Sequence, residues 1–232
     1  MRKGKVVLGY VHPTEVAAAF HESVLGLVMY DFNHGRHVVD GGGRLARYSS
    51  ANVSNARNGI VRQFLDQTHA EWLWMVDADM TFAPDALERL LDDADPQRAP
   101  IVGGLCFGVD NGALFPTLYD LTQREDGEPQ MVRYHDYPRQ AMFQVAATGA
   151  ACLLVHRRVL HRLREQYPEP YPWFSEGVLG GSPMGEDISF CLRAGAQGFP
   201  VFVNTGVEVG HVKTYTLTAD MYQRQREAER TP

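Results

Sequence analysis

The sequence predicts an α/β fold, with a mostly parallel central sheet flanked by helices and a second half that is richer in loops. Short apolar runs typical of buried strands alternate with segments of helical spacing up to about residue 108, as in βαβ units. The 232 residues are 44% hydrophobic and 22% charged, which is typical of a globular protein with a large core. No linker or internal repeat divides the chain, so we expect one domain over residues 1–232, with halves at 1–108 and 109–232.

Charge and cysteine content exclude several classes of protein. The formal charge is −6 and the pI is near 5.8, so the broad basic surface of a dedicated nucleic-acid-binding protein is not expected. No apolar run approaches the roughly 18 residues of a membrane span, and the start of the chain does not resemble a signal peptide. Cys106, Cys152 and Cys191 lie far apart, which favours three buried thiols over a disulfide framework. We therefore expect a cytoplasmic protein, and the sequence leaves its oligomeric state open.

The first half begins with a strand, a loop and a helix. Residues 6–11 form an apolar run rich in β-branched side chains, which predicts a buried parallel strand. Helical spacing of apolar residues then begins, with Thr14 as the predicted N-cap. A turn is predicted at residues 40–43, and a second helix is expected to begin near residues 52–55.

A third strand and the elements after it extend the same pattern. Residues 72–76 are apolar on both faces, so we expect a central strand that ends at the Asp-Ala-Asp triplet of residues 77–79. A helix is predicted after Pro84, and residues 101–104 are typical of the next strand. Because parallel sheets bind ligands at the carboxyl ends of their strands, the triplet lies where a site is expected.

The second half is less regular. A loop-rich stretch covers residues 110–139, and a run of small and apolar residues follows at 147–155. The remaining predicted elements are a basic helix at 157–166, an aromatic segment at 171–174, a helix from 185 to about 195 and a strand at 201–203.

The strongest chemical signal is the pair Asp77 and Asp79. Side chains alternate along a strand, so these carboxylates point the same way and repel one another unless a cation or hydrogen-bond donors lie between them. Oxygen ligands of this kind suit Mg²⁺ or Mn²⁺, which bind diphosphates. The alternative is a structural turn in which the carboxylates cap the following segment. Asp93 and Asp95 have the same spacing but lie at a predicted helix end, where solvated acidic residues are the simpler interpretation.

Two further signals lie late in the chain. Glu186 and Asp187 open a predicted helix, where carboxylates commonly act as caps. A carboxylate held there by backbone donors can also accept a proton from a hydroxyl. His211 follows an apolar strand; a lone histidine is usually structural or exposed, although neutral imidazole also binds Mn²⁺.

Other candidates carry less weight. His34 and His37 lie in a predicted loop and suggest no chemistry. The glycines at residues 41–43 lack the Lys-Ser/Thr pair of a phosphate-binding loop. The aromatic segment that contains Trp173 could stack on a sugar face or a base, and packing under a loop is an equal alternative.

Together and in this order, these features resemble the nucleotide-sugar glycosyltransferases of the GT-A fold, particularly short soluble phage and bacterial members of the family 2-like group. The resemblance covers roughly residues 5–213. The family motifs are an opening nucleoside-binding loop, an Ala-Arg-Asn-x-Gly-Ile helix start, a metal-binding Asp-x-Asp, a Glu-Asp pair that supplies the base, and a late metal-binding His. The corresponding segments are His12-Pro13-Thr14, residues 54–60 with Arg57, residues 77–79, residues 185–187 and Gly210-His211.

The resemblance implies a GT-A, Rossmann-like fold in which residues 1–108 bind a nucleotide sugar and residues 109–232 bind the acceptor and complete catalysis. It implies an Mn²⁺ or Mg²⁺ ion and an acceptor hydroxyl on a glycan, a small molecule or a modified DNA base, and for a phage enzyme a location in the host cytoplasm. The expected outcome is inversion at the anomeric carbon. The residues it assigns are Asp187 and Glu186 for catalysis, His12, Pro13, Arg57, Asp77 and Lys213 for the donor, and Asp77, Asp79 and His211 for the metal. Because the aromatic segment precedes the proposed base in sequence, Trp173 is expected to line the acceptor or sugar pocket.

Three other interpretations remain open from the sequence. A nucleotidyltransferase would share the sheet and the metal, but the Gly-rich basic loop that it usually needs is absent after Val11. A non-catalytic carbohydrate- or nucleic-acid-binding module would have no use for an ionised base beside a metal site. A retaining transferase would keep the donor residues without using Asp187 as the base.

Overall fold

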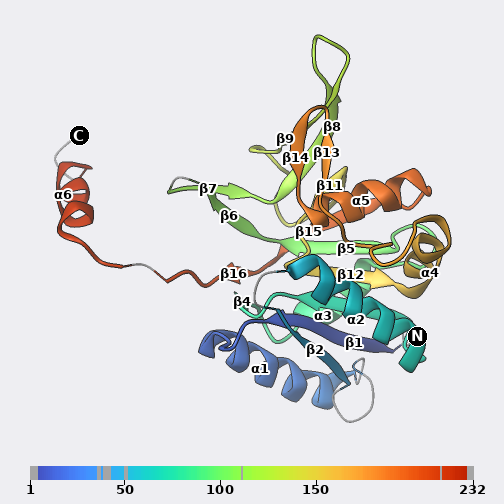
Figure 1. Cartoon of the computed structure of the whole chain (residues 1–232). Helices are drawn as coiled ribbons and strands as arrows, with labels where there is room; N and C mark the ends of the chain where they lie inside the picture. The colour runs from blue at the N-terminus through green and yellow to red at the C-terminus, as the bar shows by residue number, and fades with distance from the viewer. Residues whose placement is uncertain are drawn as a thin grey trace.

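The computed structural model describes residues 5–35, 38, 43–49, 52–110, 112–214 and 216–228, and its centre is a seven-stranded sheet (Figure 1). The strand order is β10-β15-β5-β12-β3-β1-β2, in which five strands are mutually parallel and β12 and β10 run antiparallel. The predicted α/β fold with a mostly parallel sheet is confirmed. The strands are β1 (Val6–His12), β2 (Arg44–Tyr48), β3 (Trp72–Val76), β5 (Ile101–Leu105), β10 (Met142–Val145), β12 (Cys152–His156) and β15 (Val201–Glu208).

Helices cover both faces of this sheet, because the interior strands carry apolar side chains on alternate sides. One core lies between the sheet and α2, α4 and α5, and a second core lies on the opposite face under α1 and α3. All five residues of β3 are buried, as expected for an interior strand. The helices in the described residues are α1 (Ala18–His34), α2 (Val53–Gln67), α3 (Ala86–Asp93), α4 (Arg157–Gln166), α5 (Glu186–Ala196) and α6 (Ala219–Ala228).

Short strands extend from the carboxyl ends of the central strands. Two of them, β4 and β16, pair with one another and connect the segment after β3 to the segment after β15. The others form hairpins or small sheets that rise above the main sheet in Figure 1. These strands are β4 (Met80–Thr81), β16 (Gly210–His211), β6 (Phe107–Asp110), β7 (Ala113–Pro116), β8 (Leu118–Gln123), β9 (Pro129–Arg133), β11 (Ala147–Thr148), β13 (Gly177–Leu179) and β14 (Ser182–Met184).

The structure differs from the sequence prediction at three places. The helix predicted from Thr14 begins at Ala18, because Ala17 donates its N–H to the Ala78 carbonyl and the chain before it forms a loop. The stretch at residues 110–139, predicted to be rich in loops, forms the hairpins β6–β7 and β8–β9. The strand predicted at 201–203 continues to Glu208.

The remaining predictions concern the three cysteines, membrane-spanning helices and two segments near residues 37 and 40–42. Cys106, Cys152 and Cys191 are free and buried, as predicted. No helix in the described part of the chain has the length and apolar character needed to cross a membrane. Figure 1 shows α6 at the end of an extended segment, away from the main body. His37 and residues 40–42 of the predicted turn lie outside the described residues.

Candidate functional site

Seven of the sequence-predicted residues line one pocket at the carboxyl ends of β1 and β3, whereas His211, Lys213 and Trp173 do not. Its volume is about 520 Å³, and the first turns of α2 and α5 close its sides. This is the edge at which open α/β sheets bind ligands. The polar and charged side chains that line it are His12, Glu15, Ser49, Arg57, Asp77, Asp79, Glu186 and Asp187, and Pro13 lines it as well.

Arg57 is the centre of a buried ion-pair network that we call the Arg57 cluster, formed by Arg57, Asp77 and Glu186. Its Nη2 donates to both Asp77 carboxylate oxygens at 2.7 and 3.0 Å, and its Nη1 donates to Glu186 Oε1. The Arg57 side chain is only 6% exposed. Burial disfavours its charge, but the carboxylates of Asp77 and Glu186 outweigh this, so the pKa of Arg57 is raised and the guanidinium stays charged. The cluster therefore ties α2, the end of β3 and the start of α5 together.

Local sequence explains why Arg57 reaches this position. Asn52 caps α2 by accepting the Asn55 N–H at 2.8 Å, which fixes the first turn of the helix, directly before Arg57. Gly59 has no side chain to clash with β2, where a Cβ at this position would lie only 2.9 Å from the side-chain Nε of Arg47. The α2 helix can thus pack closely against the edge strand beside the pocket.

Asp187 lies beside this cluster at the start of α5. Its Oδ1 accepts the backbone N–H of Ile188 at 2.8 Å. Burial raises the pKa of Asp187 above its ordinary value, and the carboxylate of Glu186 adds to this, while the charge of Arg57 opposes it. A carboxylate with a raised pKa that opens onto a pocket has the properties of a general base.

A second group, which we call the Asp79 cluster, consists of Asp79, His211 and Lys213. The pairing of β4 with β16 places His211 opposite Met80, one residue beyond Asp79. Asp79 Oδ2 then lies 2.9 Å from His211 Nε2 and 3.3 Å from Lys213 Nζ. The Asp79 side chain is 41% exposed, against 30% for Asp77 and 6% for Arg57, so this cluster is the more open of the two to solvent.

The hydrogen bonds of His211 indicate what could bind between its ring and Asp79. Its Nδ1 is 2.9 Å from the Phe107 carbonyl oxygen, so this nitrogen must carry the proton that it donates. In the neutral ring the unprotonated Nε2 then faces Asp79 Oδ2, and two lone pairs at 2.9 Å repel. A proton or a metal cation between them removes the repulsion. The separation is that of an ordinary N–H···O hydrogen bond, and Asp79 Oδ2 and His211 Nε2 are also the two atoms that would hold a divalent cation.

The predicted metal set of three residues is only partly assembled. Asp77 is engaged by Arg57, while Asp79 and His211 face one another. Among the described residues no group of three or more His, Cys, Asp or Glu side chains is arranged around one ion position. The protein thus presents two metal-ligating side chains, and water or substrate oxygens would have to complete an octahedral shell.

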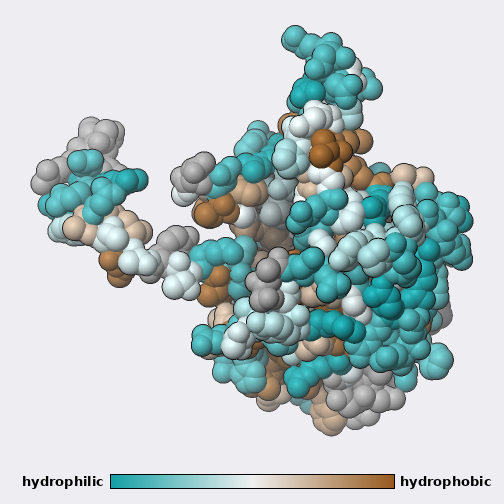
Figure 2. Space-filling view, in the orientation of Figure 1, coloured by the Kyte–Doolittle hydropathy of each residue, from teal (hydrophilic) through white to brown (hydrophobic). Residues whose placement is uncertain are grey.

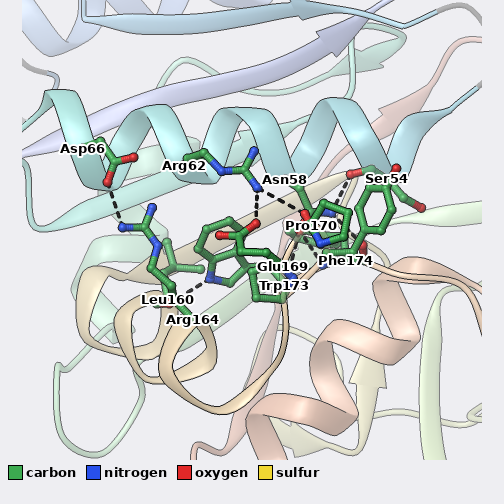
Figure 3. Close-up of polar contacts among 12 residues, drawn as sticks. Ser54, Asn58, Arg62, Asp66, Leu160, Arg164, Glu169, Pro170, Trp173 and Phe174 are labelled. Atoms are coloured by element: carbon green, nitrogen blue, oxygen red, sulfur yellow. Dashed lines mark hydrogen bonds and ion pairs between the residues drawn. The ribbon is translucent and has the colours of Figure 1, made fainter.

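Trp173 does not line the pocket, and the prediction that it stacks on an acceptor ring is wrong. Its side chain is fully buried, and its Nε1 donates to the Leu160 carbonyl at 2.8 Å. Figure 3 shows the indole held between α2 and α4, with the guanidinium groups of Arg62 and Arg164 near its faces. The packing alternative is therefore correct, because no ring face of Trp173 is left for a ligand.

Asn58 is a residue that the sequence reasoning missed. Its side chain donates to the Phe174 carbonyl at 2.6 Å and accepts the N–H groups of Trp173 and Phe174 (Figure 3). It thereby fixes the aromatic segment against the helix that carries Arg57. A polar residue next to a functional arginine within a helix was the available signal, but its partner lies more than a hundred residues away.

The weaker candidates have structural roles, as the sequence suggested. Asp95 accepts the backbone N–H groups of Gln97 and Arg98, and Asp93 accepts from Asn204 Nδ2. His34 contacts the carbonyl of the preceding helical turn at 2.9 Å. None of these residues lines the pocket.

The fold and the site define the class of protein. Solved GT-A structures resemble this chain at 12% sequence identity. "A197 from STIV" has a TM-score of 0.58, and the match covers 90% of this chain and 86% of that one. "GalNAc-T7 with UDP, GalNAc and Mn2+" has a TM-score of 0.60, with coverage of 91% of this chain and 44% of that one. The chain thus has the GT-A fold.

The sequence itself assigns the family. Residues 43–229 match the family described as "Glycosyltransferase like family 2", and the chain belongs to this family. A search of curated proteins finds no match. The protein is a glycosyltransferase, so the nucleotidyltransferase and the non-catalytic binding module are set aside.

Proposed function

We propose that the protein transfers a sugar from a nucleoside-diphosphate sugar to an acceptor hydroxyl, with inversion at the anomeric carbon, Asp187 as the base and a divalent cation as cofactor. The observation that carries the proposal is that Asp187 borders the same 520 Å³ pocket as Asp77, Asp79 and Arg57. Groups suited to a diphosphate and a group suited to deprotonation thus face one cavity. Single displacement requires this arrangement, because donor and acceptor must meet in one site.

On the donor side, the loop after β1 and the start of α2 supply the binding surface. His12 and Pro13 line the pocket at the end of β1, where a nucleoside would enter. Arg57 contributes positive charge while it holds Asp77 in place. Lys213, which is 40% exposed beside Asp79, supplies a cation to the diphosphate side.

Asp79 and His211 are the residues that would hold a divalent cation. A carboxylate oxygen and an imidazole nitrogen form a donor set that suits Mn²⁺ or Mg²⁺, and the facing lone pairs of the two groups fit a shared ion. Such an ion neutralises diphosphate charge and so stabilises the leaving group. GalNAc-T7, which shares the fold, was solved with UDP, GalNAc and Mn²⁺, and this supports the choice of cofactor by analogy.

On the acceptor side, Asp187 would take the proton of the attacking hydroxyl. The hydrogen bond from the Ile188 N–H fixes one carboxylate oxygen and leaves the other, Oδ2, for the acceptor. Its raised pKa makes it a stronger base than an exposed aspartate. Glu186 has a different role, since it is held by Arg57 and shapes the start of α5.

A ligand-stabilisation screen tests this function. Thermal unfolding is measured with UDP-, GDP-, CMP- and dTDP-sugars, each with Mn²⁺ and with EDTA. We expect one nucleotide class to raise Tm with Mn²⁺ and to lose most of that effect with EDTA, because a ligand that binds only the folded state stabilises it by mass action. Equal stabilisation in the two conditions would contradict metal-dependent donor binding.

A further inference from the structure

A second cavity lies between two hairpins on the other side of the α5 N-terminus. Its volume is about 310 Å³, and its walls come from β8–β9 and from β13–β14. Figure 1 shows these hairpins rising side by side above the sheet. We call this cavity the hairpin groove. Its apolar lining includes Tyr119, Met131, Leu179, Met184 and Ile188, and its polar lining includes Arg124, Gln130 and Ser182.

The hairpin groove meets the donor pocket at the proposed base. Gly185 and Ile188 line the groove, whereas Glu186 and Asp187 between them line the donor pocket. Tyr119 lines the groove and also lies near Asp187: burial raises the pKa of its hydroxyl, Arg133 opposes this rise, and the Asp187 carboxylate adds to it. A ligand in the groove would therefore lie beside the start of α5 that carries Asp187.

The lining of the groove indicates the chemistry of such a ligand. Its walls expose polar and apolar surface in nearly equal amounts, and no carboxylate lines it among the described residues. Its cation, Arg124, is already engaged, since it donates to the Gly180 carbonyl at 2.9 Å and lies 3.3 Å from Asp126. A volume of about 310 Å³ is at the lower end for small-molecule sites, which suits one ring with an apolar face.

Charge around the groove argues against a nucleic acid. Residues 107–139 and 175–187, which form the hairpins and the start of α5, carry nine Asp and Glu against three Arg and no Lys, a formal charge of −6. Two of the three arginines, Arg124 and Arg133, already face carboxylates. Figure 2 shows a hydrophilic tip on this arm with apolar atoms beneath it. Proteins that bind DNA or RNA neutralise several phosphates with Lys and Arg, and this surface has the opposite sign.

We propose that the hairpin groove is the acceptor site and that its acceptor is an uncharged, ring-bearing hydroxyl compound, such as a sugar attached to an apolar group, and not a nucleic acid. This inference rests on the proposed function, and it selects among the acceptors that the sequence left open. The acceptor ring would lie against Tyr119 and the methionines while its hydroxyl reaches Asp187.

One test fills the groove without touching the donor pocket. Ser182→Trp places a large side chain at a groove-lining position, and Val178→Trp is its matched control on the same hairpin, at a position that is 71% exposed and does not line the groove. We expect Ser182→Trp to lower kcat/KM for the acceptor by about tenfold or more with unchanged donor affinity. Val178→Trp should match the wild type. An unchanged kcat/KM in a folded Ser182→Trp protein would overturn the assignment.

A second test compares acceptor classes, with the nucleotide sugar selected by the stabilisation screen. The probes are a panel of 4-nitrophenyl glycosides and a duplex oligonucleotide that contains 5-hydroxymethylcytosine. We expect glycosides to bind and to receive the sugar, and the oligonucleotide to remain unmodified at low and at physiological salt. Transfer to the oligonucleotide, or the absence of binding by every glycoside, would show that the proposal is wrong. If the wild type binds no nucleotide sugar at all, the proposed function fails instead.

Discussion

Asp77 and Asp79 belong to one Asp-Ala-Asp triplet, yet the structure places them in two different environments. Asp77 is 30% exposed, and both of its carboxylate oxygens accept hydrogen bonds from Arg57, whose side chain is only 6% exposed. Asp79 is 41% exposed and faces His211 and Lys213. Because side chains alternate along a strand, Asp77 and Asp79 were expected to point the same way and to bind the same ligand. One carboxylate of such a pair can therefore be held in the wall of a site by a neighbouring arginine, while the other remains available to a ligand.

The partners of the two aspartates explain this division. Arg57 and Glu186 come from two helices that pack on the same core, and Arg57 at the centre of the cluster is buried. His211 and Lys213 come from a two-residue strand and the segment that follows it. We expect changes in the first cluster to affect folding and changes in the second to affect ligand binding.

Arg57→Ala should have the largest effect. It leaves Asp77 and Glu186 as poorly solvated carboxylates without their partner, so we expect the free energy of unfolding to fall by about 3 kcal/mol. Arg62→Ala on the same helix is the control, because its pair with Glu169 is exposed and should contribute less than about 1 kcal/mol. Urea unfolding measures both. Equal losses of unfolding free energy in the two variants would contradict a structural role for Arg57 in holding Asp77 and Glu186.

Asp187→Asn should lower transfer by roughly 10²-fold or more, because the amide cannot accept the acceptor proton. Donor affinity should not change. Since burial raises the pKa of Asp187, its charge opposes folding at neutral pH, and the variant should be at least as stable as the wild type. Single-turnover rates and unfolding curves check the two parts. A folded variant with wild-type turnover would refute the assignment of the base.

Asp79→Asn should weaken nucleotide binding in Mn²⁺ by about tenfold or more, with little change in stability because the side chain is exposed. Asp95→Asn, in the other Asp-Ala-Asp triplet, serves as the control, since Asp95 accepts backbone N–H groups, pairs with the exposed Arg98 and does not line the pocket. Titration calorimetry with the nucleotide gives both affinities. The distinction between the two clusters fails if Asp79→Asn unfolds the protein while leaving affinity unchanged in the folded fraction.

The smallest effect concerns pH. The base must be ionised, so kcat/KM should fall as pH decreases through the raised pKa of Asp187, and this acid limb should lie above the range of an ordinary aspartate. The residual activity of Asp187→Asn should lack this limb. Profiles of kcat/KM against pH for the two proteins provide the comparison, and an identical acid limb in both would assign it to another group.

Local signals predicted much of the fold. The buried run of β3, the basic helix α4 and the start of α5 at its Glu-Asp pair lie where their patterns place them. The hairpins β6–β7 and β8–β9 were missed because short, half-exposed strands show only a weak alternation of apolar and polar residues. Such strands are defined by their pairing with each other, which no single segment encodes. The start of α1 was missed because the N–H of Ala17 is bonded to Ala78, a contact that no local pattern encodes.

The candidate site was predictable as a set of residues but not as a set of contacts. Asp77, Asp187 and Arg57 were identified from their place in the chain, whereas the pairing of Arg57 with Glu186 spans 129 residues. Trp173 was assigned to the acceptor because it precedes the base in sequence. Burial against α2 and α4 decided its role, and burial depends on elements that are distant along the chain.

The anomeric configuration of the product tests the central claim most directly. If Asp187 deprotonates the acceptor for a single displacement, the transferred sugar must have the configuration opposite to that in the nucleotide sugar. Proton NMR of the product, recorded early enough to avoid mutarotation of any free sugar, distinguishes the two anomers by their coupling constants. We predict inversion. A product with the configuration of the donor would contradict the single displacement and the role of Asp187 in it.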